Sequence, residues 1–549
     1  MSYLILALIA IILVFIITRF YVKHEAKKKL DQIRSKWAKV KAESFHFDSI
    51  KKYAGNATES EFHSLTDQTI ADVELYDLFA FIDRTTSKVG QQFLYNKIVK
   101  PRNNVDTQSE KLIHLFTHDT KLREKAQLEL HKLSDSDAYQ ISNLLKDELL
   151  DKPKWFKWLA VDVTIVIILF ILSIKFPVLL IALIIPFSLN VFLHFWNKSN
   201  TFKFVRSFPQ LDLLINASKV LSKNGDLCFD ESVPENIMNL RSFQRKAMLI
   251  KFDSGSGFQS ELSQLVNYVF ELIKAFFLIE VFVLHQAIKE LRNRQSDIAN
   301  VFNYVGIIDS SISIASLRAG EYKTCQPVFM PAKKELEVNS IYHPLVENCV
   351  RNSLSIRGKS ILITGSNMSG KSTFLKTLII NSILAQTINT CFADEYLSPT
   401  LKQFSSIRID DDLFTGRSYY FQEVSVMASL IEKIDTPHQN LFILDEVFKG
   451  TNTVERISAA KGILSYLNSG NNIVIVSTHD VELVDMLSDE YDLYHFTETI
   501  ENNELHFDHA IRSGALKTRN AIKILELSNY PAAIVKEAMK VSATFDLLK

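Results

Sequence analysis

The stretch ILITGSNMSGKSTFL, residues 361–375, decides the fold of the C-terminal half of this 549-residue chain. ILIT predicts a buried strand, and the run that follows the loop predicts a helix. Gly365 and the triplet Gly370-Lys371-Ser372 match the spacing G-x-x-x-x-G-K-S/T, in which backbone N–H groups and a helix N-terminus face phosphates. The sequence therefore predicts an α/β fold with a phosphate-binding loop, the P-loop.

The P-loop residues have separate expected roles. Lys371 would reach the β- and γ-phosphates of a nucleotide, and the Ser372 hydroxyl would ligate Mg²⁺. ATP and Mg²⁺ are therefore the expected cofactors. Besides these two residues, we expect the nucleotide to be bound by Gly365, Ser366, Met368, Ser369, Gly370 and Thr373.

Two further apolar runs end in polar side chains. LFILDEVFKG, residues 441–450, carries Asp445 and Glu446 at the end of a predicted strand, and NIVIVSTH, residues 472–479, ends in His479. Adjacent acids at the end of a buried strand are costly unless they serve a metal or a water. We expect Asp445 to hold Mg²⁺ and Glu446 to orient or deprotonate the attacking water. His479 would sense the γ-phosphate, although a histidine at a strand end is more often only a satisfied polar residue.

Composition bounds the remaining possibilities. Length predicts roughly three or four domains, and a hydrophobic share of 47% supports sizeable cores. The chain has 62 basic and 62 acidic residues, so net charge predicts no particular partner. The four cysteines, Cys228, Cys325, Cys349 and Cys391, are scattered, which argues against zinc ribbons and disulfide frameworks and favours reduced cytosolic thiols.

The N-terminus predicts a membrane anchor over residues 1–21. Residues 3–18 are almost wholly apolar, and the basic residues follow this run instead of preceding it. A cleavable signal peptide has the opposite order, so an uncleaved helix is expected, with the following chain in the cytoplasm.

A second apolar block, residues 155–196, predicts a transmembrane hairpin. Ser173, Lys175 and Pro177 interrupt it near its centre, and lysines and tryptophans flank both outer ends. Residues 266–285 are also apolar but carry three charges, so we expect a buried core helix there. The prediction is a multi-pass protein of the inner or plasma membrane, with three transmembrane helices and a cytoplasmic nucleotide site.

Residues 22–41 form a basic stretch, with eight Lys or Arg against two acids. Such a stretch suits anionic lipid or a nucleic-acid backbone. A flank that stops membrane transfer, on a solvated helix, explains the same charges and is the favoured interpretation.

An ordered series of motifs in the C-terminal half resembles one family. The motifs are YHPLVE (342–347), GSNMSGKST (365–373), DDLFTGRSYYFQEV (411–424), LDEVFKGTNT (444–453) and STHDVEL (477–483). They are similar to those of the ATPase domain of the MutS mismatch-repair proteins, which are relatives of the ABC ATPases. Phe448 and Lys449 depart from the family's Gly-Arg.

The resemblance implies further residues and an assembly. Asn367 would contact the nucleotide, and Ser418 would reach the γ-phosphate bound by a partner subunit. Composite ATP sites of this kind imply a homodimer. The segment 520–541 resembles the closing helices that help to hold that dimer, so the family's ATPase domain would occupy residues 321–549.

Upstream segments resemble the helical lever of the same family. Residues 72–101 match its start, within a helical cytosolic region expected over 22–150, and residues 200–320 resemble its return. The positions in register are Asp83, Thr85, Gly90, Leu94 and Pro101. About 70 residues precede this motif, which leaves no room for the family's mismatch-reading and connector domains. The hairpin lies near where relatives insert the clamp that grips DNA.

The expected fold is thus an ABC-like α/β P-loop ATPase domain with an all-α lever domain. The expected function is a membrane-anchored, MutS-like ATPase that hydrolyses ATP and binds DNA, in mismatch repair or a related DNA transaction. The alternative is an ATP-driven conformational machine that acts on membrane components or on an unidentified protein partner without DNA.

Overall fold

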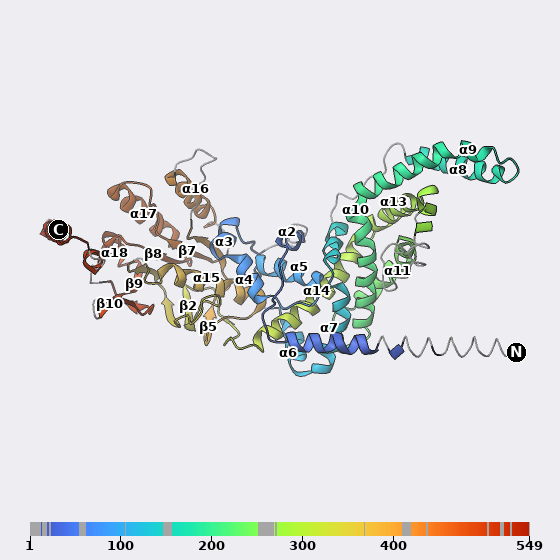
Figure 1. The fold of residues 1–549 in the computed structure, drawn as a ribbon. Coiled ribbons are helices and arrows are strands. Elements are labelled where there is room, and N and C mark those ends of the chain that lie inside the picture. The colour runs from blue at the N-terminus through green and yellow to red at the C-terminus, as the bar shows by residue number, and fades with distance from the viewer. Residues whose placement is uncertain are drawn as a thin grey trace. The chain divides into compact units, whose positions relative to one another are not determined.

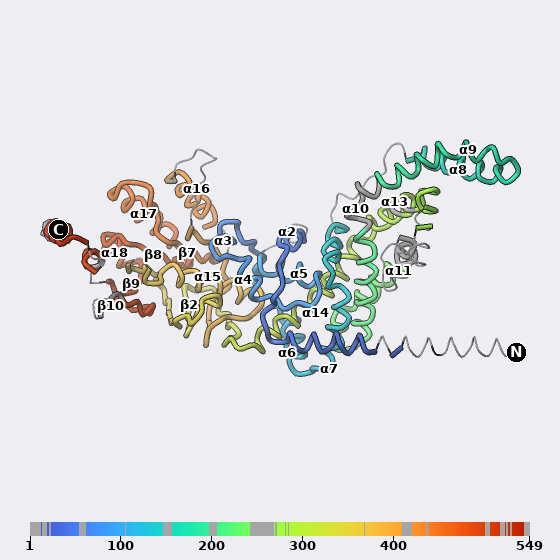
Figure 2. The backbone as a smooth tube through the Cα atoms, viewed as in Figure 1, coloured from blue at the N-terminus to red at the C-terminus, as the bar shows by residue number. Residues whose placement is uncertain are grey.

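A computed structural model describes most of the chain (Figures 1 and 2). It covers residues 23–53, 62–104, 106–145, 156–250, 272–366, 368–408, 419–434, 438–501, 504–516, 521–527 and 530–547, with isolated positions 13, 19, 20, 268 and 269. The expected anchor over residues 3–18 lies outside these residues apart from position 13.

The chain divides into two compact units, each assembled from separate segments. We name residues 1–58, 83–96 and 107–319 the helical body, and residues 59–82, 97–106 and 320–549 the nucleotide unit. The domain boundaries drawn from the sequence remain predictions, whereas this division follows contacts in space.

A six-stranded sheet forms the centre of the nucleotide unit. Its strand order is β12-β9-β4-β8-β7-β6, and every neighbouring pair is parallel except β12 with β9. The strands are β4 (Ser360–Thr364), β6 (Lys402–Ser406), β7 (Asn440–Asp445), β8 (Ile473–Ser477), β9 (Tyr491–His495) and β12 (Arg512–Ser513). All residues of β4 and β8 are buried, because a parallel sheet covered on both faces needs continuous apolar runs.

Helices cover the two faces of this sheet. Helices α16 (Tyr419–Ile431), α17 (Thr453–Leu467) and α18 (Val481–Leu487) share one apolar cluster with alternate residues of the strands, including Phe442 and Val474. Helix α15 (Lys371–Ile388) also packs on β6, β7 and β8. Strand residues between the cluster members, such as Ile443 and Ile475, point to the opposite face, where α15 finds its apolar partners. The unit is therefore layered α/β/α around the P-loop helix.

Smaller elements complete the nucleotide unit. A second sheet has the order β1-β5-β2-β3, and β10 pairs with β11 as a hairpin. These elements and the last helices are β1 (Val328–Phe329), β2 (Glu335–Ile341), β3 (Asn352–Arg357), β5 (Glu395–Ser398), β10 (Glu498–Glu501), β11 (Glu504–Phe507), α19 (Ala521–Leu527) and α20 (Ala532–Leu547).

An early segment of the chain is built into the nucleotide unit. Helices α3 (Asp67–Asp72) and α4 (Leu75–Ile82) belong to it, and α3 packs on β6. Asp72 is fully buried and accepts hydrogen bonds from the Ser405 hydroxyl and from the backbone N–H groups of Ile407 and Arg408. A carboxylate with these donors fixes the end of β6 to residues far upstream.

The helical body is built from helices packed around α14 (Gln295–Arg318), which is buried along most of its length. Its other described elements are α2 (Phe47–Ile50), α5 (Lys88–Val99), α6 (Thr107–His118), α7 (Thr120–Leu130), η2 (His131–Leu133), η3 (Ser136–Leu145), α8 (Phe156–Ser173), α9 (Leu179–Ala182), α10 (Ile184–Leu221), η4 (Gly225–Leu227), α11 (Val233–Ile250) and α13 (Ile279–Arg292).

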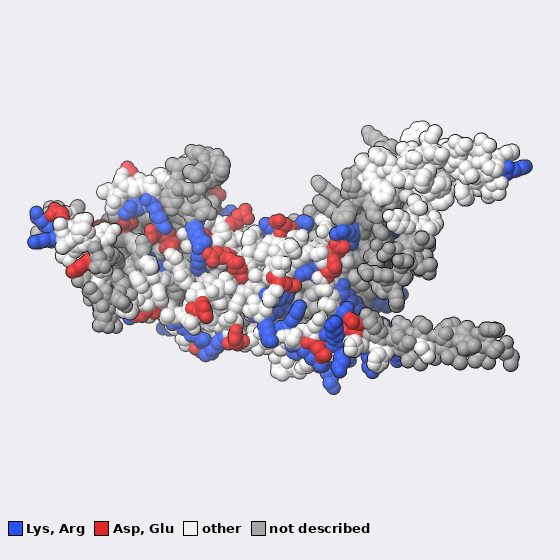
Figure 3. Space-filling view, viewed as in Figure 1, with Lys and Arg blue, Asp and Glu red and all other residues white. Residues whose placement is uncertain are grey.

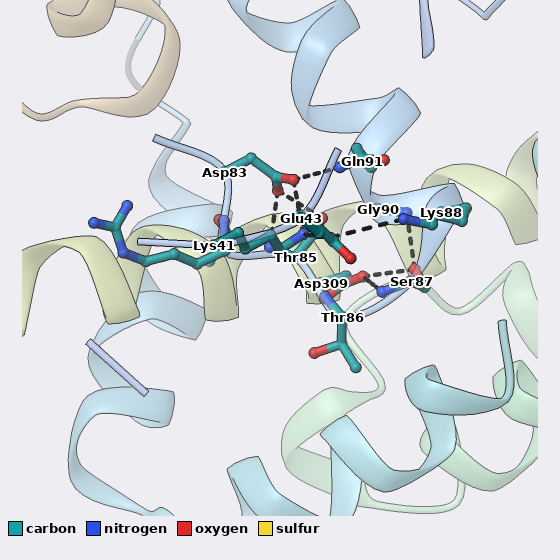
Figure 4. A network of polar contacts seen from close by, with 12 residues as sticks. Lys41, Glu43, Asp83, Thr85, Thr86, Ser87, Lys88, Gly90, Gln91 and Asp309 are labelled. Atoms are coloured by element: carbon teal, nitrogen blue, oxygen red, sulfur yellow. Dashed lines mark hydrogen bonds and ion pairs between the residues drawn. The ribbon is translucent and has the colours of Figure 1, made fainter. Parts of the chain in front are cut away.

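A buried polar network explains the motif at residues 83–90 (Figure 4). The Asp309 carboxylate of α14 accepts hydrogen bonds from the N–H groups of Thr86 and Ser87 and from the Ser87 hydroxyl, at 2.5–2.8 Å. A Cβ atom on Gly90 would lie 2.2 Å from Asp309 Oδ2, so glycine is required there. Asp83 is fully buried beside Lys41, whose ammonium is 2.7 Å from its carboxylate. The motif therefore joins α5 to α14.

The expected hairpin corresponds to α8 and the first part of α10, joined through α9. Three described helical segments are long and apolar enough to cross a membrane: Phe156–Ser173, Leu179–Trp196 and Gln295–Arg318. The first two bear few charged side chains on their visible surface (Figure 3). The third is α14, most of which is buried among the helices of the body, and we interpret it as a core helix.

Residues 266–285 do not form one continuous helix where they are described. Leu278 has a left-handed backbone, with φ of 49°, directly before α13. Leu278 and Val281 pack with Leu159 of α8 in a small apolar cluster, and Asn190 of α10 donates to the carbonyl oxygen of Phe276. This segment therefore packs against the hairpin.

Helix α10 joins the hairpin to the rest of the body. It runs without a break for 38 residues, from Ile184 in the apolar hairpin to Leu221. Its second half buries Phe208, Leu211 and Leu214. One regular element therefore belongs to both the hairpin and the body core.

Candidate functional site

The P-loop connects the buried end of β4 to the start of α15. Gly370 caps α15 with φ of 106°, a backbone conformation that favours glycine. A Cβ atom on Gly365 would meet the carbonyl oxygen of Phe496 at 2.8 Å. The two glycines of the motif are thus required by local geometry, and the loop delivers Lys371 and Ser372 to the first turn of the helix.

Lys371 is held inside the loop. Its side-chain ammonium donates to the carbonyl oxygens of Gly365 and Ser366, each at 2.8 Å, and Nζ lies 3.4 Å from His479 Nε2. Desolvation lowers the pKa of Lys371, while the carboxylates of Asp445 and Glu446 oppose this change. A buried cation with carbonyl partners at the mouth of a P-loop is placed to bind phosphate oxygens.

Ser372 and Asp445 meet as the sequence predicts for a magnesium site. The Ser372 hydroxyl donates to Asp445 Oδ2 at 2.5 Å, and the Ser477 hydroxyl donates to Oδ1 of the same carboxylate. Hydroxyl and carboxylate oxygens are the hard ligands that Mg²⁺ prefers, and it commonly takes one or two protein carboxylates and completes its shell with waters and substrate phosphates. The donor set fits this ion. Within the described residues, no group of three or more His, Cys, Asp or Glu side chains forms a metal cluster.

Glu446 and His479 form a close side-chain pair beside this site. His479 Nε2 is 2.7 Å from Glu446 Oε1, and the Lys449 ammonium is 3.6 Å from Oε2. The hydrogen bond from His479, with the nearby Lys449 and Lys371 charges, lowers the pKa of Glu446 to about 2. Glu446 is therefore ionised at neutral pH and able to accept a proton or a water hydrogen bond.

Helix α16 fixes the loop that follows these acids. Glu423 of α16 is buried and accepts hydrogen bonds from the N–H groups of Lys449 and Gly450, at 2.8 and 3.1 Å. Phe448 has a left-handed backbone, with φ of 62°, and its ring lies 5.7 Å from that of Tyr420. The residue that replaces the family's glycine thus lies where glycine is the least strained choice.

A cavity of about 400 Å³ opens beside the P-loop. Residues of the loop and of α15 line one side of it, including Ser366, Met368, Gly370, Lys371, Ser372 and Thr373, and Glu446 also contributes. The remaining wall comes from the segment Val346–Val350, Asn352, Phe496 and His509. This mixed polar and apolar space lies where a nucleotide bound to the loop would extend.

The structure brings together most of the residues expected from the sequence. The described loop residues Gly365, Ser366, Met368, Ser369, Gly370, Lys371, Ser372 and Thr373 lie together, and Asp445, Glu446 and His479 lie beside them. Asn367 and Ser418 fall outside the described residues, so their roles remain predictions.

Sequence reasoning missed three residues of the site. His509 Nδ1 is 3.0 Å from the Ser369 carbonyl oxygen, and the Ser366 hydroxyl donates to Glu498 at 2.6 Å. Glu423 is the third. His509 and Glu498 carry no local signal, because they come from the β-hairpin region more than 120 residues downstream of the loop. Glu423 lies in the motif at residues 411–424, so its position in that motif was the signal that could have identified it as a site residue.

The nucleotide unit has a P-loop on a mostly parallel sheet covered by helices. Beside the loop lie a hydroxyl–carboxylate pair and a Glu–His pair. These features define the class of P-loop ATPase domains. Residues 361–546 match the family model of MutS domain V.

Relatives agree with this match. The chain is 30% identical to the DNA mismatch repair protein MutS of Carboxydothermus hydrogenoformans over 271 residues, which is 47% of this chain and 32% of that protein. The MutS of Lactobacillus delbrueckii subsp. bulgaricus is 29% identical over 292 residues, 51% of this chain and 33% of that protein. Residues 361–546 of the chain are therefore similar to the MutS ATPase domain, and the chain spans about a third of the length of the curated relatives it matches.

Proposed function

We propose that the site binds and hydrolyses Mg-ATP. The observation that carries this proposal is the approach of Ser372 to Asp445, at 2.5 Å, directly beside the Glu446–His479 pair. Bound Mg²⁺ would neutralise charge on the phosphates. Lys371 exchanges its loop carbonyls for phosphate oxygens, and Glu446 orients the attacking water and accepts its proton.

The adjoining cavity receives the base and ribose of the nucleotide. Its wall offers the apolar side chains of Val346, Val350 and Phe496 together with the His509 ring. Apolar and aromatic surfaces with a few polar groups are typical of sites for small organic ligands.

The active form is a homodimer with composite sites. This proposal rests on the resemblance of residues 411–424 to the family motif in which the serine, here Ser418, reaches the partner's nucleotide. Helix α19 and the first part of α20 lie in the segment that resembles the family's dimer-forming helices.

The protein is anchored in the inner or plasma membrane by three helices, with the nucleotide unit in the cytoplasm. The support is the apolar character of α8 and of residues 179–196, together with the apolar run at residues 3–18. The basic residues that follow that run place the chain after it on the cytoplasmic side.

From the similarity to the curated MutS relatives we further propose that the dimer binds DNA, in mismatch repair or a related DNA transaction. The curated relatives are named DNA mismatch repair proteins.

A second candidate is an ATP-driven machine that acts on membrane components or a protein partner without DNA. One observation favours it: α10 is a single helix shared by the hairpin and the body core. A continuous helix of this kind, which contains Pro209 in its second half, can transmit motion between the parts that it joins.

One experiment separates the two candidates. ATP hydrolysis of the full-length protein in lipid nanodiscs is measured without DNA and with matched, mismatched and branched duplexes, with Glu446→Ala as the blank. A change of turnover with any DNA supports the DNA-binding candidate, and the order of the substrates shows whether mismatches are distinguished. Robust turnover that no DNA alters supports the membrane machine, and turnover equal to the blank overturns the ATPase assignment.

A further inference from the structure

Two of the four cysteines, distant in sequence, lie opposite each other in the nucleotide unit. Cys325 and Cys391 form an isolated antiparallel bridge, and their backbones exchange two N–H···O hydrogen bonds, each of 2.9 Å. In such a hydrogen-bonded pair the Cα atoms are about 5.5 Å apart, which lies within the range that a disulfide spans. The spacing of the two backbones is therefore compatible with a bond between the two sulfur atoms.

The surroundings of the two thiols differ. Cys325 is half-buried, whereas Cys391 is fully buried, with its thiol 3.6 Å from the Asn381 carbonyl oxygen. A hydrogen bond from the Cys391 thiol lowers the pKa of Cys325, against the opposing effect of burial. The more accessible sulfur is thus also the one whose thiolate is stabilised, and thiolates are the reacting form.

We propose that Cys325 and Cys391 are an oxidation site, at which a small-molecule disulfide converts the two thiols into an intramolecular disulfide. The Cys325 thiolate attacks one sulfur of oxidised glutathione, and one glutathione thiolate leaves. The Cys391 thiol then loses its proton to water, its sulfur attacks Cys325 Sγ, and the second glutathione thiolate leaves. Two protein thiols are oxidised and one glutathione disulfide is reduced to two thiols.

The new bond would join two structurally important segments. Cys391 lies just after α15, the helix that begins at the P-loop, and Cys325 lies in the segment that follows α14. Because the two backbones are already paired, the bond requires only a local closing of the two Cβ atoms towards each other. We expect oxidation to stabilise the nucleotide unit, since the unfolded chain loses the freedom of the loop between the two cysteines.

The test uses the full-length protein in detergent, equilibrated with oxidised and reduced glutathione in fixed ratios and then mapped by mass spectrometry without reduction. The expected product is a linked pair of peptides containing Cys325 and Cys391. Exposed Cys228 serves as the internal control, because it should acquire glutathione without an intramolecular link. The proposal is overturned if Cys228 is modified while Cys325 and Cys391 are recovered as free thiols or as separate glutathione adducts.

A stability measurement gives a second readout. Oxidation should raise the melting temperature of the wild type by on the order of 5 °C or more, and reduction should reverse this. The rise should persist in Cys228→Ser and vanish in Cys325→Ser. A rise that survives in Cys325→Ser contradicts the assignment. Because Cys325 is only half-buried, we expect the Cys325→Ser variant to fold. The peptide map of the wild type tests the proposal independently, since it requires no variant.

Discussion

At the scale of single residues, Glu446 depends on its neighbours. The side chain of His479 contributes most to the low pKa of this carboxylate. We predict that His479→Ala lowers turnover by roughly 10²-fold, the size of a typical acid–base contribution. The pKa of Glu446 should rise towards that of an ordinary carboxyl group, so the acid limb of the pH–rate profile should move to higher pH. Steady-state kinetics across pH measures both effects, and an unmoved acid limb would show that the pair does not control this group.

Phe448 supplies a test of backbone strain. It is buried and has φ of 62°, so truncation to alanine should cost about 3–5 kcal/mol in the free energy of unfolding. Glycine tolerates this backbone better than alanine. We therefore predict that Phe448→Gly is more stable than Phe448→Ala by about 1 kcal/mol, the reverse of the usual order. Denaturant unfolding of both variants checks this, and an alanine variant that is the more stable contradicts it.

Asp309 should make the stability of the helical body depend on pH. Burial raises the pKa of this carboxyl group to about 6, above that of an unfolded aspartic acid. The folded body therefore binds the Asp309 proton more tightly than the unfolded chain does. The resulting stabilisation is fully present below about pH 4 and is lost as the pH rises through 6. Two pKa units correspond to about 2–3 kcal/mol.

The comparison that isolates this effect is Asp309→Asn, which cannot titrate. We expect the wild type to exceed the variant in stability by a larger margin at pH 5 than at pH 7. Hydrogen exchange of α5 amides reports the difference, and a margin independent of pH would exclude this role for Asp309.

At the scale of elements, α16 supports the loop after β7 through one buried carboxylate. We predict that Glu423→Gln, which replaces one acceptor oxygen by an NH₂ group facing N–H donors, destabilises this loop by about 1–3 kcal/mol. ATP hydrolysis should fall because Glu446 begins the same loop, while ATP affinity is retained. The matched control is Glu432→Gln, an exposed position one residue beyond the same helix. Equal effects of the two substitutions on turnover would contradict a specific role for Glu423.

The elements also show what the sequence could predict. Strands β4, β7 and β8 and helix α15 follow from continuous apolar runs and the glycine spacing, which are local signals. The contacts of His509, the burial of Asp72 under β6 and the pairing of Cys325 with Cys391 join residues that are remote in sequence. A single sequence carries no record of such pairings, so the scattered cysteines gave no sign that Cys325 and Cys391 lie opposite each other.

At the scale of the whole molecule, ATP should control assembly. We predict that Glu446→Gln retains ATP without hydrolysis. Added Mg-ATP should then shift the monomer–dimer equilibrium of this variant towards dimer by at least about tenfold, because in the proposed composite sites each trapped nucleotide would be held by two subunits. Light scattering of the detergent-solubilised protein measures this shift. Ser418→Ala in the same background should abolish it, whereas a dimer that ignores both ATP and Ser418 would argue against composite sites.

The segment 62–82 has a consequence for biosynthesis. Its helices are an integral part of the nucleotide unit, where Asp72 fixes the end of β6. The ribosome makes this segment first and must then release the whole hairpin region before β6 exists. Contacts between such distant segments form slowly. The early segment must therefore wait, with its apolar side chains uncovered, until the hairpin region has been made, so completion of the nucleotide site follows synthesis of the hairpin.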